Sequence, residues 1–288
     1  MSGIIVRIVG GLGNQLFCYA AARRLSLANG VPLKLDAVSG FRNDQYGRVY
    51  LLDKFNIKAQ KASPLESFDF RGGRLARYAA RKANRLVRFE RRRYIVEETE
   101  DRFDPRMLGI RPVGSVYLEG YWQSPKYFLD VEDDLRRDLA ITEPHEEITI
   151  QESLAIKKAE NPVCLGVRLF QETAGNQNIM SRDYYLAAMD KMASAIPNAH
   201  FFVFCNDAQW VMKNLEIRHP HTFITPKPES ERACEDLWLM GLCNHFIIPN
   251  STYHWWGAWL SKNKAKIVFA PKHGFPNAHT VPSEWNVI

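Results

Sequence analysis

The sequence predicts an α/β protein built from two Rossmann-like domains that face a cleft. Near the N-terminus, an apolar run over residues 4–9 meets a glycine cluster at 10–13, and a helical pattern follows. Apolar strand-like runs then alternate with helical patterns in both halves of the chain. Such alternation is typical of a parallel sheet, and two sets of it favour two domains. We expect domains at 1–150 and 151–288, with the boundary near the polar stretch 141–152.

In the first half, residues 4–9 are predicted to form a strand and residues 14–29 a helix. The segment VPLKLDAV follows as a second strand that ends at Asp36. Residues 71–93 then carry ten Lys or Arg against one Glu, with arginines repeating every three or four residues along one helical face. We expect an apolar stripe on the opposing face, formed by Leu75, Ala79, Ala83 and Leu86.

The basic segment 71–93 has two interpretations. One is a solvated surface helix, and the other is a helix that lies near anionic lipid or a phosphate-bearing substrate. The second would make the protein peripheral at an anionic membrane surface. Nucleic acid is not expected, because aromatic residues do not interleave the arginines as base stacking requires.

In the second half, the runs VCLGVRL, AHFFVFCND, NHFIIPNS and AKIVFAP are predicted strands. The helices between them are SRDYYLAAMDKMASAIP, EDLWLMGLC and STYHWWGAWLSKN. Ser181 is expected to cap the first helix, and a Ser/Thr pair the last. Ligands of parallel α/β sheets bind beyond the carboxyl ends of the strands, where loop 10–15, Arg168, residues 206–207 and the cap 250–252 are expected.

Composition bounds the class of protein. Hydrophobic residues make up 46% and charged residues 24% of the 288 residues, as in ordinary soluble proteins. We find no apolar run long enough to cross a membrane and no signal-peptide pattern. The five cysteines form no C-x-x-C pair, so neither a zinc site nor a disulfide framework is expected. These features favour a cytoplasmic protein with reduced thiols.

The glycine cluster is a weak match to a dinucleotide-binding fingerprint. Gly11 and Gly13 supply the first two glycines, but Leu16 stands where the third small residue belongs, and no Walker lysine follows. Asp36 lies at the distance of a ribose-binding acid. The alternative is a tight strand-to-helix turn that glycine permits. A nicotinamide cofactor is the less favoured interpretation. A phosphate-bearing ligand held by Arg168 and a helix start is favoured.

Three stretches, GGLGNQLFCYAAARRLS, GYWQSPKYF at 120–128 and NSTYHWWGAWL at 250–260, resemble the α-1,2-fucosyltransferases of glycosyltransferase family 11. The resemblance runs almost from end to end. It implies a GT-B-like fold and transfer of L-fucose from GDP-fucose to a hydroxyl of a saccharide acceptor, O2 of a galactoside in this family. It further implies inversion at the anomeric carbon, no metal or other cofactor, and a role in glycan or surface polysaccharide synthesis. The basic segment adds a lipid-linked saccharide as a candidate acceptor.

One segment departs from the family pattern H-x-R-R-x-D. Of its four specified residues only Arg168 remains, while Gly166, Leu169 and Gln171 replace the histidine, the second arginine and the aspartate. Two alternatives therefore stand beside fucose transfer. In the first, the protein has the same fold but uses another nucleotide-sugar donor. In the second, the chain is a non-catalytic homologue that binds a nucleotide or a glycan.

Under the resemblance, Arg168 binds the β-phosphate and stabilises the departing GDP. Asn250, Ser251 and Thr252 hold phosphate oxygens, and Asp207 accepts hydrogen bonds from the guanine edge. Each assignment has a structural alternative, namely a salt bridge for Arg168, a helix cap for 250–252 and a loop carboxylate for Asp207.

In the first half, Asn14 and Gln15, beside Gly11 and Gly13, are expected to position the acceptor or the fucose hydroxyls. The alternative is that the two amides hold the loop. The candidates for stacking on guanine or sugar are Tyr253 and Trp122. The ambiguous residues are His254 and His273, and the carboxylates considered for the general base are Glu172 and Asp36.

Overall fold

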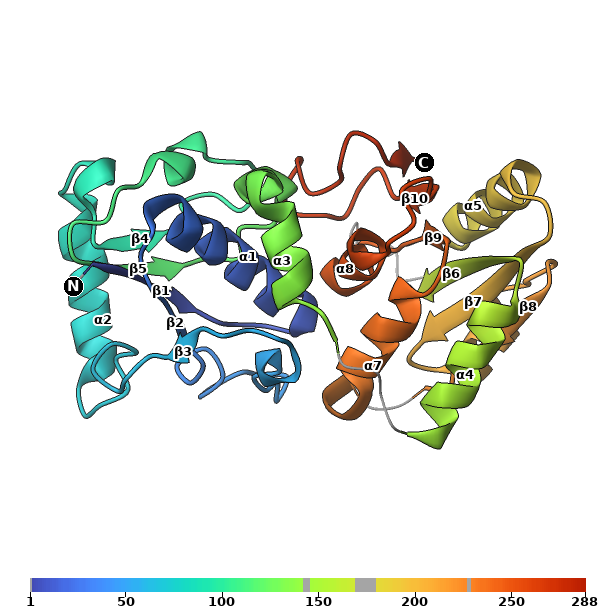
Figure 1. Cartoon of the computed structure of the whole chain (residues 1–288), viewed down its shortest axis with the longest axis horizontal. Coiled ribbons are helices and arrows are strands. Elements are labelled where there is room, and N and C mark those ends of the chain that lie inside the picture. The colour runs from blue at the N-terminus through green and yellow to red at the C-terminus, as the bar shows by residue number, and fades with distance from the viewer. Residues whose placement is uncertain (1, 142–145, 169–179, 227–228) are drawn as a thin grey trace. The chain divides into compact units, whose positions relative to one another are not determined.

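The computed structural model describes residues 2–141, 146–168, 180–226 and 229–288. The chain divides into two compact units, and each has its own parallel sheet with flanking helices (Figure 1). Unit 1 comprises Met1–Ala140 and Pro276–Thr280, and unit 2 comprises Ile141–Phe275 and Val281–Ile288. The predicted α/β class with a Rossmann-like sheet in each half is confirmed. The return of Pro276–Thr280 to unit 1 has no counterpart in the prediction.

The sheet of unit 1 has five parallel strands in the order β3-β2-β1-β5-β4. The strands are β1 (Gly3–Arg7), β2 (Leu33–Asp36), β3 (Gln60–Lys61), β4 (Tyr94–Val96) and β5 (Ser115–Glu119). Ile4 and Val6 of β1 are fully buried, as expected for the central strand of a parallel sheet covered on both faces. Both strands predicted in this half are present, as β1 and β2.

Helix α1 (Leu12–Asn29) packs against β1 and β2, close to the bounds that the sequence predicts (Figure 1). It begins two residues after Gly10, whose φ of +78° is a left-handed conformation that favours glycine. It ends at the left-handed Gly30. The other helices of unit 1 are α2 (Gly73–Arg85) and α3 (Glu132–Asp138), with short 3-10 turns η1 (Leu52–Lys54), η2 (Phe89–Arg91), η3 (Pro105–Gly109), η4 (Pro125–Tyr127) and η5 (Leu129–Val131).

The basic segment folds differently from the prediction. Only Gly73–Arg85 is α-helical, and α2 turns Arg77 inward, where its guanidinium lies 3.7 Å from the buried carboxylate of Asp36. The predicted apolar stripe points to solvent instead, with Leu75 76% and Leu86 91% exposed. The assignment of the arginines to the solvated face is therefore wrong for Arg77. The physical reason is that a carboxylate buried at the end of β2 attracts a cation.

The sheet of unit 2 has six parallel strands in the order β11-β10-β9-β6-β7-β8. The strands are β6 (Asn161–Val167), β7 (Ala199–Cys205), β8 (His221–Phe223), β9 (His245–Ile247), β10 (Val268–Ala270) and β11 (Asn286–Val287). The four strands predicted in this half are β6, β7, β9 and β10. The prediction lacks β8 and β11, which lie at the sheet edges and are too short to give a periodic signal.

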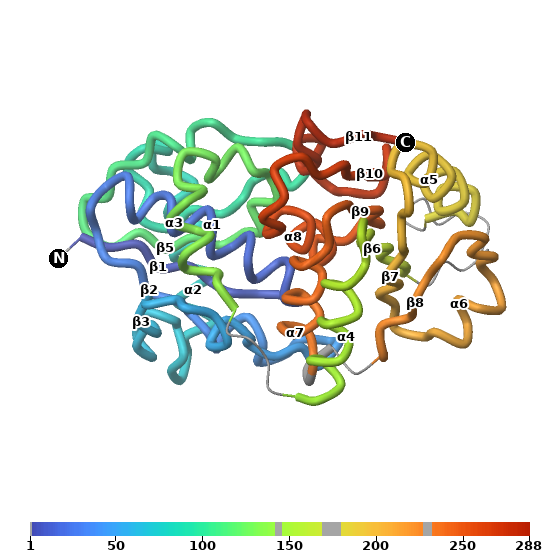
Figure 2. The backbone as a smooth tube through the Cα atoms, turned by 45° about the vertical axis from the view of Figure 1, so that its right-hand side comes forward, coloured from blue at the N-terminus to red at the C-terminus, as the bar shows by residue number. Residues whose placement is uncertain are grey.

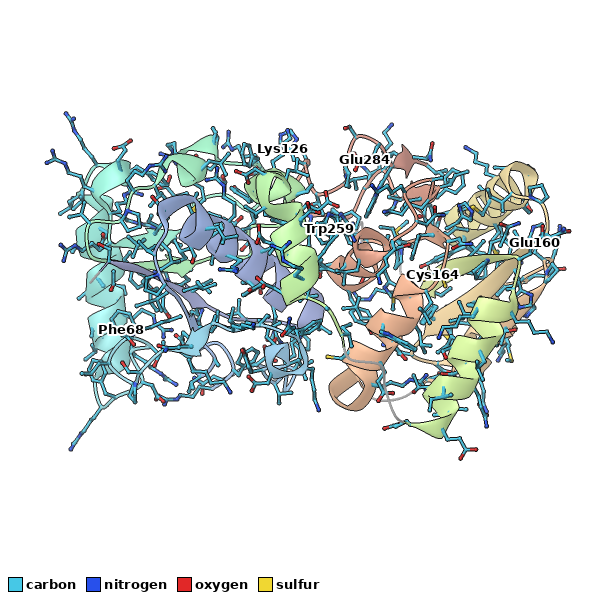
Figure 3. The ribbon with its side chains drawn as sticks, in the orientation of Figure 1. Phe68, Lys126, Glu160, Cys164, Trp259 and Glu284 are labelled. Atoms are coloured by element: carbon cyan, nitrogen blue, oxygen red, sulfur yellow. The ribbon has the colours of Figure 1, made fainter. Side chains whose placement is uncertain are left out.

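The helices of unit 2 are α4 (Glu147–Lys158), α5 (Arg182–Ala195), α6 (Ala208–Asn214), α7 (Glu229–Gly241) and α8 (Thr252–Leu260). Ser181 caps α5 as predicted, because its hydroxyl accepts a hydrogen bond from the Tyr184 N–H at 3.2 Å. Helix α7 packs against both α4 and α8 (Figure 2). Trp255 and Trp256 of α8 are fully buried, and Trp259 is 6% exposed (Figure 3), so these tryptophans are core residues.

Alternate residues of β6 face different layers of unit 2. Val163, Leu165 and Val167 join an apolar cluster with residues of α5. A side chain at Gly166 would instead extend from the opposite face of the sheet, where His254 of α8 lies. The end of β6 therefore lies between two packed layers, which fixes the position of the residue that follows it.

Candidate functional site

A hollow lies at the carboxyl ends of the strands of unit 2, where parallel α/β sheets bind ligands. Strands β6 and β7 lead into it, and α7 and α8 supply the remaining wall. The lining residues are Val167, Arg168, Phe204, Cys205, Asn206, Ala233, Asp236, Met240, Ser251, Tyr253 and His254. Of the residues predicted for the site, Arg168, Ser251 and Tyr253 are thus brought together.

Arg168 directly follows β6 and is exposed at the hollow. Its backbone N–H donates to the hydroxyl of Tyr185 in α5 at 3.3 Å, which ties the strand end to the neighbouring layer. The backbone of Arg168 is therefore fixed at the hollow, and its exposed guanidinium is available to a bound anion. Three residues discussed with it, Leu169, Gln171 and Glu172, lie outside the described residues.

Gly166, which stands where the family pattern has histidine, lies against the imidazole of His254 from α8. A β-carbon at position 166 would lie 2.7 Å from Nε2 of that ring. His254 is only 7% exposed, and burial, followed by the charge of Arg168, lowers its pKa to about 3. The hollow therefore contains a neutral imidazole beside a guanidinium.

Helix α8 begins at the hollow. Ser251 occupies the N-cap position, but its side chain makes no capping hydrogen bond and lines the hollow instead. The Tyr253 hydroxyl donates to the Ala233 carbonyl at 2.6 Å, which holds α8 against α7. Asn250 and Thr252 flank Ser251 and are not among the lining residues. Only the middle residue of the predicted cap is thus placed to contact a ligand in this hollow.

Asp207 has a structural role. Its carboxylate accepts a hydrogen bond from the Trp210 N–H at 2.9 Å and caps α6, and it is not among the residues that line the hollow. This arrangement favours the structural alternative over guanine recognition. The polar side chains that line this part of the hollow are Asn206 and Asp236.

Asp236 belongs to an ionic cluster around Arg232, which is 1% exposed. The guanidinium of Arg232 pairs with Glu152, and it lies 2.7 Å from Asp236 and 3.9 Å from Glu235. Burial raises the pKa of Asp236 to about 7, although the charge of Arg232 opposes this. Sequence reasoning missed Asp236. The signal available was the spacing of Arg232, Glu235 and Asp236, which places opposite charges on one helical face.

A second hollow lies at the strand ends of unit 1. Charged side chains of both signs, amides and tyrosines surround it, and Arg7 pairs with Glu119 there at 3.2 Å. The lining residues are Arg7, Val9, Gly10, Gly40, Asn43, Asp44, Gln45, Tyr46, Arg48, Arg81, Val96, Glu97, Glu100, Glu119, Gly120 and Tyr121. Such a polar and aromatic lining is suited to a hydroxyl-rich ligand.

Gln15 supports the glycine loop. The side chain is fully buried, and its amide nitrogen donates to the carbonyls of Gly10 at 2.9 Å and Val49 at 2.8 Å. Its amide oxygen accepts from the Leu51 N–H at 2.9 Å. These bonds favour the alternative in which this amide holds the loop.

Asn14, Gly11 and Gly13 lie beside the second hollow rather than in its lining, to which the loop contributes Gly10. The amide oxygen of Asn14 accepts a hydrogen bond from Gln123 at 3.0 Å. Gly11 is the N-cap residue of α1, and Gly13 is buried inside the helix. The loop therefore positions α1 and borders the hollow.

Asp36 is excluded as a base. It is fully buried, and its carboxylate accepts hydrogen bonds from the N–H groups of Val38 at 3.2 Å and Ser39 at 2.9 Å and from the Tyr117 hydroxyl at 2.5 Å. The interpretation of Asp36 as a general base or a ribose-binding acid is therefore wrong, because no free carboxylate is presented to a ligand.

Glu97, which sequence reasoning missed, follows β4 and lines the second hollow. Its carboxylate accepts hydrogen bonds from the N–H groups of Tyr121 at 2.7 Å and Trp122 at 3.1 Å. Burial raises its pKa to about 7. A carboxyl group with this pKa in a hollow is suited to general base catalysis. The available signal was an acidic residue directly after the strand-like run YIV.

Trp122 is a core residue, 2% exposed, and does not present its ring to a ligand. The stacking role considered for it is therefore wrong. His273 is exposed and lines neither hollow.

Within 2–141, 146–168, 180–226 and 229–288, no group of three or more His, Cys, Asp or Glu side chains is arranged to hold a metal ion. In the same ranges, no helix combines the length and the apolar character needed to span a bilayer.

With the fold and the two hollows established, comparison with known proteins shows the family. The chain belongs to glycosyltransferase family 11, whose family model (Glycosyl transferase family 11) matches residues 3–281. It is therefore a glycosyltransferase that acts on saccharides. An α-1,2-colitosyltransferase of Escherichia coli is 28% identical over 283 residues, which are 96% of this chain and 93% of that protein. The O-antigen biosynthesis glycosyltransferase WbnK of Escherichia coli is 25% identical over 300 residues, covering 92% of this chain and 93% of that protein.

Solved structures with a similar fold include one that is named as a fucosyltransferase. FUT1 of Arabidopsis thaliana, as a mutant in complex with GDP, gives a TM-score of 0.54 at 14% identity over 94% of this chain and 70% of that chain. The fucosyltransferase NodZ from Bradyrhizobium gives a TM-score of 0.54 at 14% identity over 89% of this chain and 92% of that chain. At this level of identity the similarity concerns the fold.

Proposed function

We propose that this glycosyltransferase transfers L-fucose from GDP-fucose to a hydroxyl of a saccharide acceptor, O2 of a galactoside, with inversion at the anomeric carbon. The observation that carries the proposal is the unit 2 hollow, where Arg168 and the start of α8 lie at the carboxyl ends of parallel strands. A guanidinium and a helix start are both suited to the phosphates of a nucleotide sugar. The reaction needs no cofactor or metal in this proposal.

The step is a single displacement. The acceptor oxygen forms a bond to the anomeric carbon while the bond from that carbon to the β-phosphate oxygen breaks, and GDP leaves with the electron pair. Arg168 stabilises the charge that develops on the phosphate. The acceptor hydroxyl gives its proton to Glu97, whose carboxylate is oriented by the Tyr121 and Trp122 N–H groups. The proposal therefore assigns the saccharide to the unit 1 hollow.

A second donor is favoured by a specific observation. The relative with 28% identity is named for transfer of colitose, a sugar that differs from L-fucose in lacking the 3-hydroxyl. The changes at Gly166, Leu169 and Gln171 also separate this chain from the family pattern. Colitose is therefore the alternative donor sugar, in O-antigen or other surface polysaccharide synthesis, the process named for WbnK.

The test is release of nucleotide from GDP-fucose and GDP-colitose over a panel of galactoside acceptors. Acceptor-dependent release from GDP-fucose supports fucose transfer, and a higher kcat/KM with GDP-colitose supports the alternative. Binding of GDP without turnover on either donor would support a non-catalytic homologue. UDP and ADP serve as control nucleotides in the binding experiment.

We further propose that the acceptor is lipid-linked and that α2 brings the protein to an anionic membrane. Leu75, Tyr78 and Leu86 recur at helical spacing and are 76%, 61% and 91% exposed. Lys82 lies on the same face, with its ammonium 5.6 Å from the Tyr78 ring centroid. Exposed apolar side chains among cations are typical of a helix that lies in a lipid interface. A second copy of the chain is a poor partner, because two such faces would repel each other.

Vesicle sedimentation tests this surface. We expect binding to phosphatidylglycerol vesicles that weakens as salt rises and that falls when Leu75 and Leu86 are both changed to Ser. Leu154→Ser is the matched control, since Leu154 is 60% exposed on α4 of unit 2. Equal binding by the wild type and the double variant would contradict the proposal.

A further inference from the structure

His254 in the wall of the unit 2 hollow has a polar atom that the fold leaves unused. Its side chain is 7% exposed, and Nδ1 has no hydrogen-bond partner among the residues that the structure describes. Buried polar atoms are normally paired, and an unpaired one destabilises the fold. An unpaired, buried nitrogen on a residue that lines a hollow therefore points to a ligand.

Gly166 makes room for this imidazole. A β-carbon at position 166 would lie 2.7 Å from Nε2 and 2.8 Å from Cγ of His254, closer than side chains approach one another. Glycine weakens the interior of a strand, and its neighbours in β6, Leu165 and Val167, are ordinary buried strand residues. The glycine is thus explained by the close approach of the ring.

The other ring nitrogen determines what Nδ1 can do. The Phe204 backbone hydrogen-bonds to the imidazole, and Nδ1 is unpaired, so Nε2 is the atom that donates to that carbonyl. Burial, followed by the charge of Arg168, lowers the pKa of His254 to about 3, so the ring is neutral. A neutral imidazole with its proton on Nε2 presents a lone pair on Nδ1. It can accept a hydrogen bond, and a phosphate oxygen cannot donate one.

We propose that Nδ1 of His254 accepts a hydrogen bond from a hydroxyl group of the bound nucleotide sugar, and that residue 166 is glycine to admit the ring. This inference rests on the proposed function, because it takes the ligand of the unit 2 hollow to be a nucleotide sugar. The hydroxyl belongs either to the ribose or to the transferred sugar. In both cases His254 is a binding residue that selects for a hydroxyl at one position.

The test compares GDP and GDP-fucose binding to the wild type, His254→Phe and His254→Ala by calorimetry. We expect at least a tenfold loss of affinity for the ligand that carries the hydroxyl. Weaker binding of both ligands identifies the ribose, and 2′-deoxy-GDP or 3′-deoxy-GDP should then bind wild type and variant equally. Weaker binding of GDP-fucose alone identifies the transferred sugar, with GDP-colitose reporting on its 3-hydroxyl.

Gly166→Ala tests the same contact by adding a β-carbon where the ring of His254 lies. It should weaken the same ligand by displacing the ring, and it should have little further effect in a His254→Ala background. Thermal unfolding of each variant separates loss of binding from loss of structure, because His254→Phe removes the bond from Nε2 to the Phe204 carbonyl together with the unpaired nitrogen. His200→Phe is the control, since His200 contacts Thr222 at 2.8 Å and does not line the hollow.

Two failures are distinguishable. A wild-type chain that binds neither GDP nor GDP-fucose contradicts the proposed function and this inference with it. A wild-type chain that binds them only as tightly as both His254 variants do contradicts this inference alone.

Discussion

Arg168 and Glu97 carry different parts of the proposed reaction. The guanidinium of Arg168 lies at the end of β6 in unit 2, while the carboxylate of Glu97 lies after β4 in unit 1. The proposal assigns Arg168 to stabilise the leaving nucleotide and Glu97 to receive the acceptor proton. Each role predicts a distinct change in kinetics.

Arg168→Ala should lower kcat for transfer by about 10²–10³, the loss typical when a charged or hydrogen-bonding group is removed from a developing negative charge. Arg168→Lys should retain part of the rate, because lysine keeps the positive charge but cannot make the bidentate hydrogen bonds of a guanidinium to a phosphate. Arg218→Ala is the control, since Arg218 is an exposed residue paired with Glu216 at 2.9 Å. Steady-state turnover near the wild-type value in Arg168→Ala would remove Arg168 from the reaction.

Glu97→Gln should lower transfer by about 10²–10⁴, the usual contribution of a general base. The carboxyl group must be ionised to accept a proton, and burial raises its pKa to about 7. In the wild type, kcat/KM should therefore fall as the pH drops below about 7. The variant should lose that limb of the pH profile while binding GDP normally.

Glu98→Gln is the control for this experiment. Glu98 is the next residue along the chain, but its carboxylate pairs with Arg92 at 2.6 Å and Arg106 at 3.1 Å and does not line the hollow. A Glu97→Gln enzyme with the pH profile of the wild type would show that another group takes the proton.

At the scale of elements, the packing of α7 against α8 shapes the unit 2 hollow. Met240 of α7 and His254 of α8 both line it. Gly257 lets the two helices approach, because a β-carbon there would lie 2.7 Å from Sδ and 2.9 Å from Cβ of Met240. The position of Ser251 and His254 therefore depends on a glycine that is not among the residues that line the hollow.

Gly257→Ala should lower the free energy of unfolding, by about 1–3 kcal/mol if the helices cannot repack. Intrinsic helix propensity predicts the opposite sign, since alanine stabilises a helix interior by about 1 kcal/mol relative to glycine. Gly241→Ala is the matched control in α7, because nothing lies within 4 Å of its β-carbon position. Denaturant unfolding that shows Gly257→Ala to be stabilising would contradict this packing.

Elements with a long periodic pattern could be predicted from the sequence, and their surroundings could not. Helix α1 and strands β6 and β7 match their predictions because apolar spacing reports directly on burial. The inverted face of α2 could not be foreseen, because an arginine is drawn inward only by the buried carboxylate of Asp36, which lies far away in the sequence.

The same limit applies to the site. The sequence predicted that Arg168 and Ser251 lie at strand ends of the second half, and both line the unit 2 hollow, since strand ends in a parallel sheet meet at one edge. It did not separate Asp207 from Asn206. Which of two adjacent polar residues caps a helix and which lines a hollow depends on the local backbone conformation, and a loop sequence does not specify this.

For the whole molecule, each of the two units contributes a hollow of its own. Unit 2 offers a hollow suited to a nucleotide sugar, and unit 1 offers a polar hollow suited to a saccharide. The outward face of α2 also belongs to unit 1, so the unit proposed to hold the acceptor is the one proposed to contact the membrane. A lipid-linked acceptor is consistent with both assignments.

The most direct test of sugar transfer follows GDP release from GDP-fucose with and without galactoside acceptors, on the full chain, with the linkage of the product determined by NMR. We predict release that rises with one acceptor class and an α-linked fucose on O2. No release from GDP-fucose with any acceptor, by a chain that is folded and binds GDP, would contradict the proposed fucose transfer.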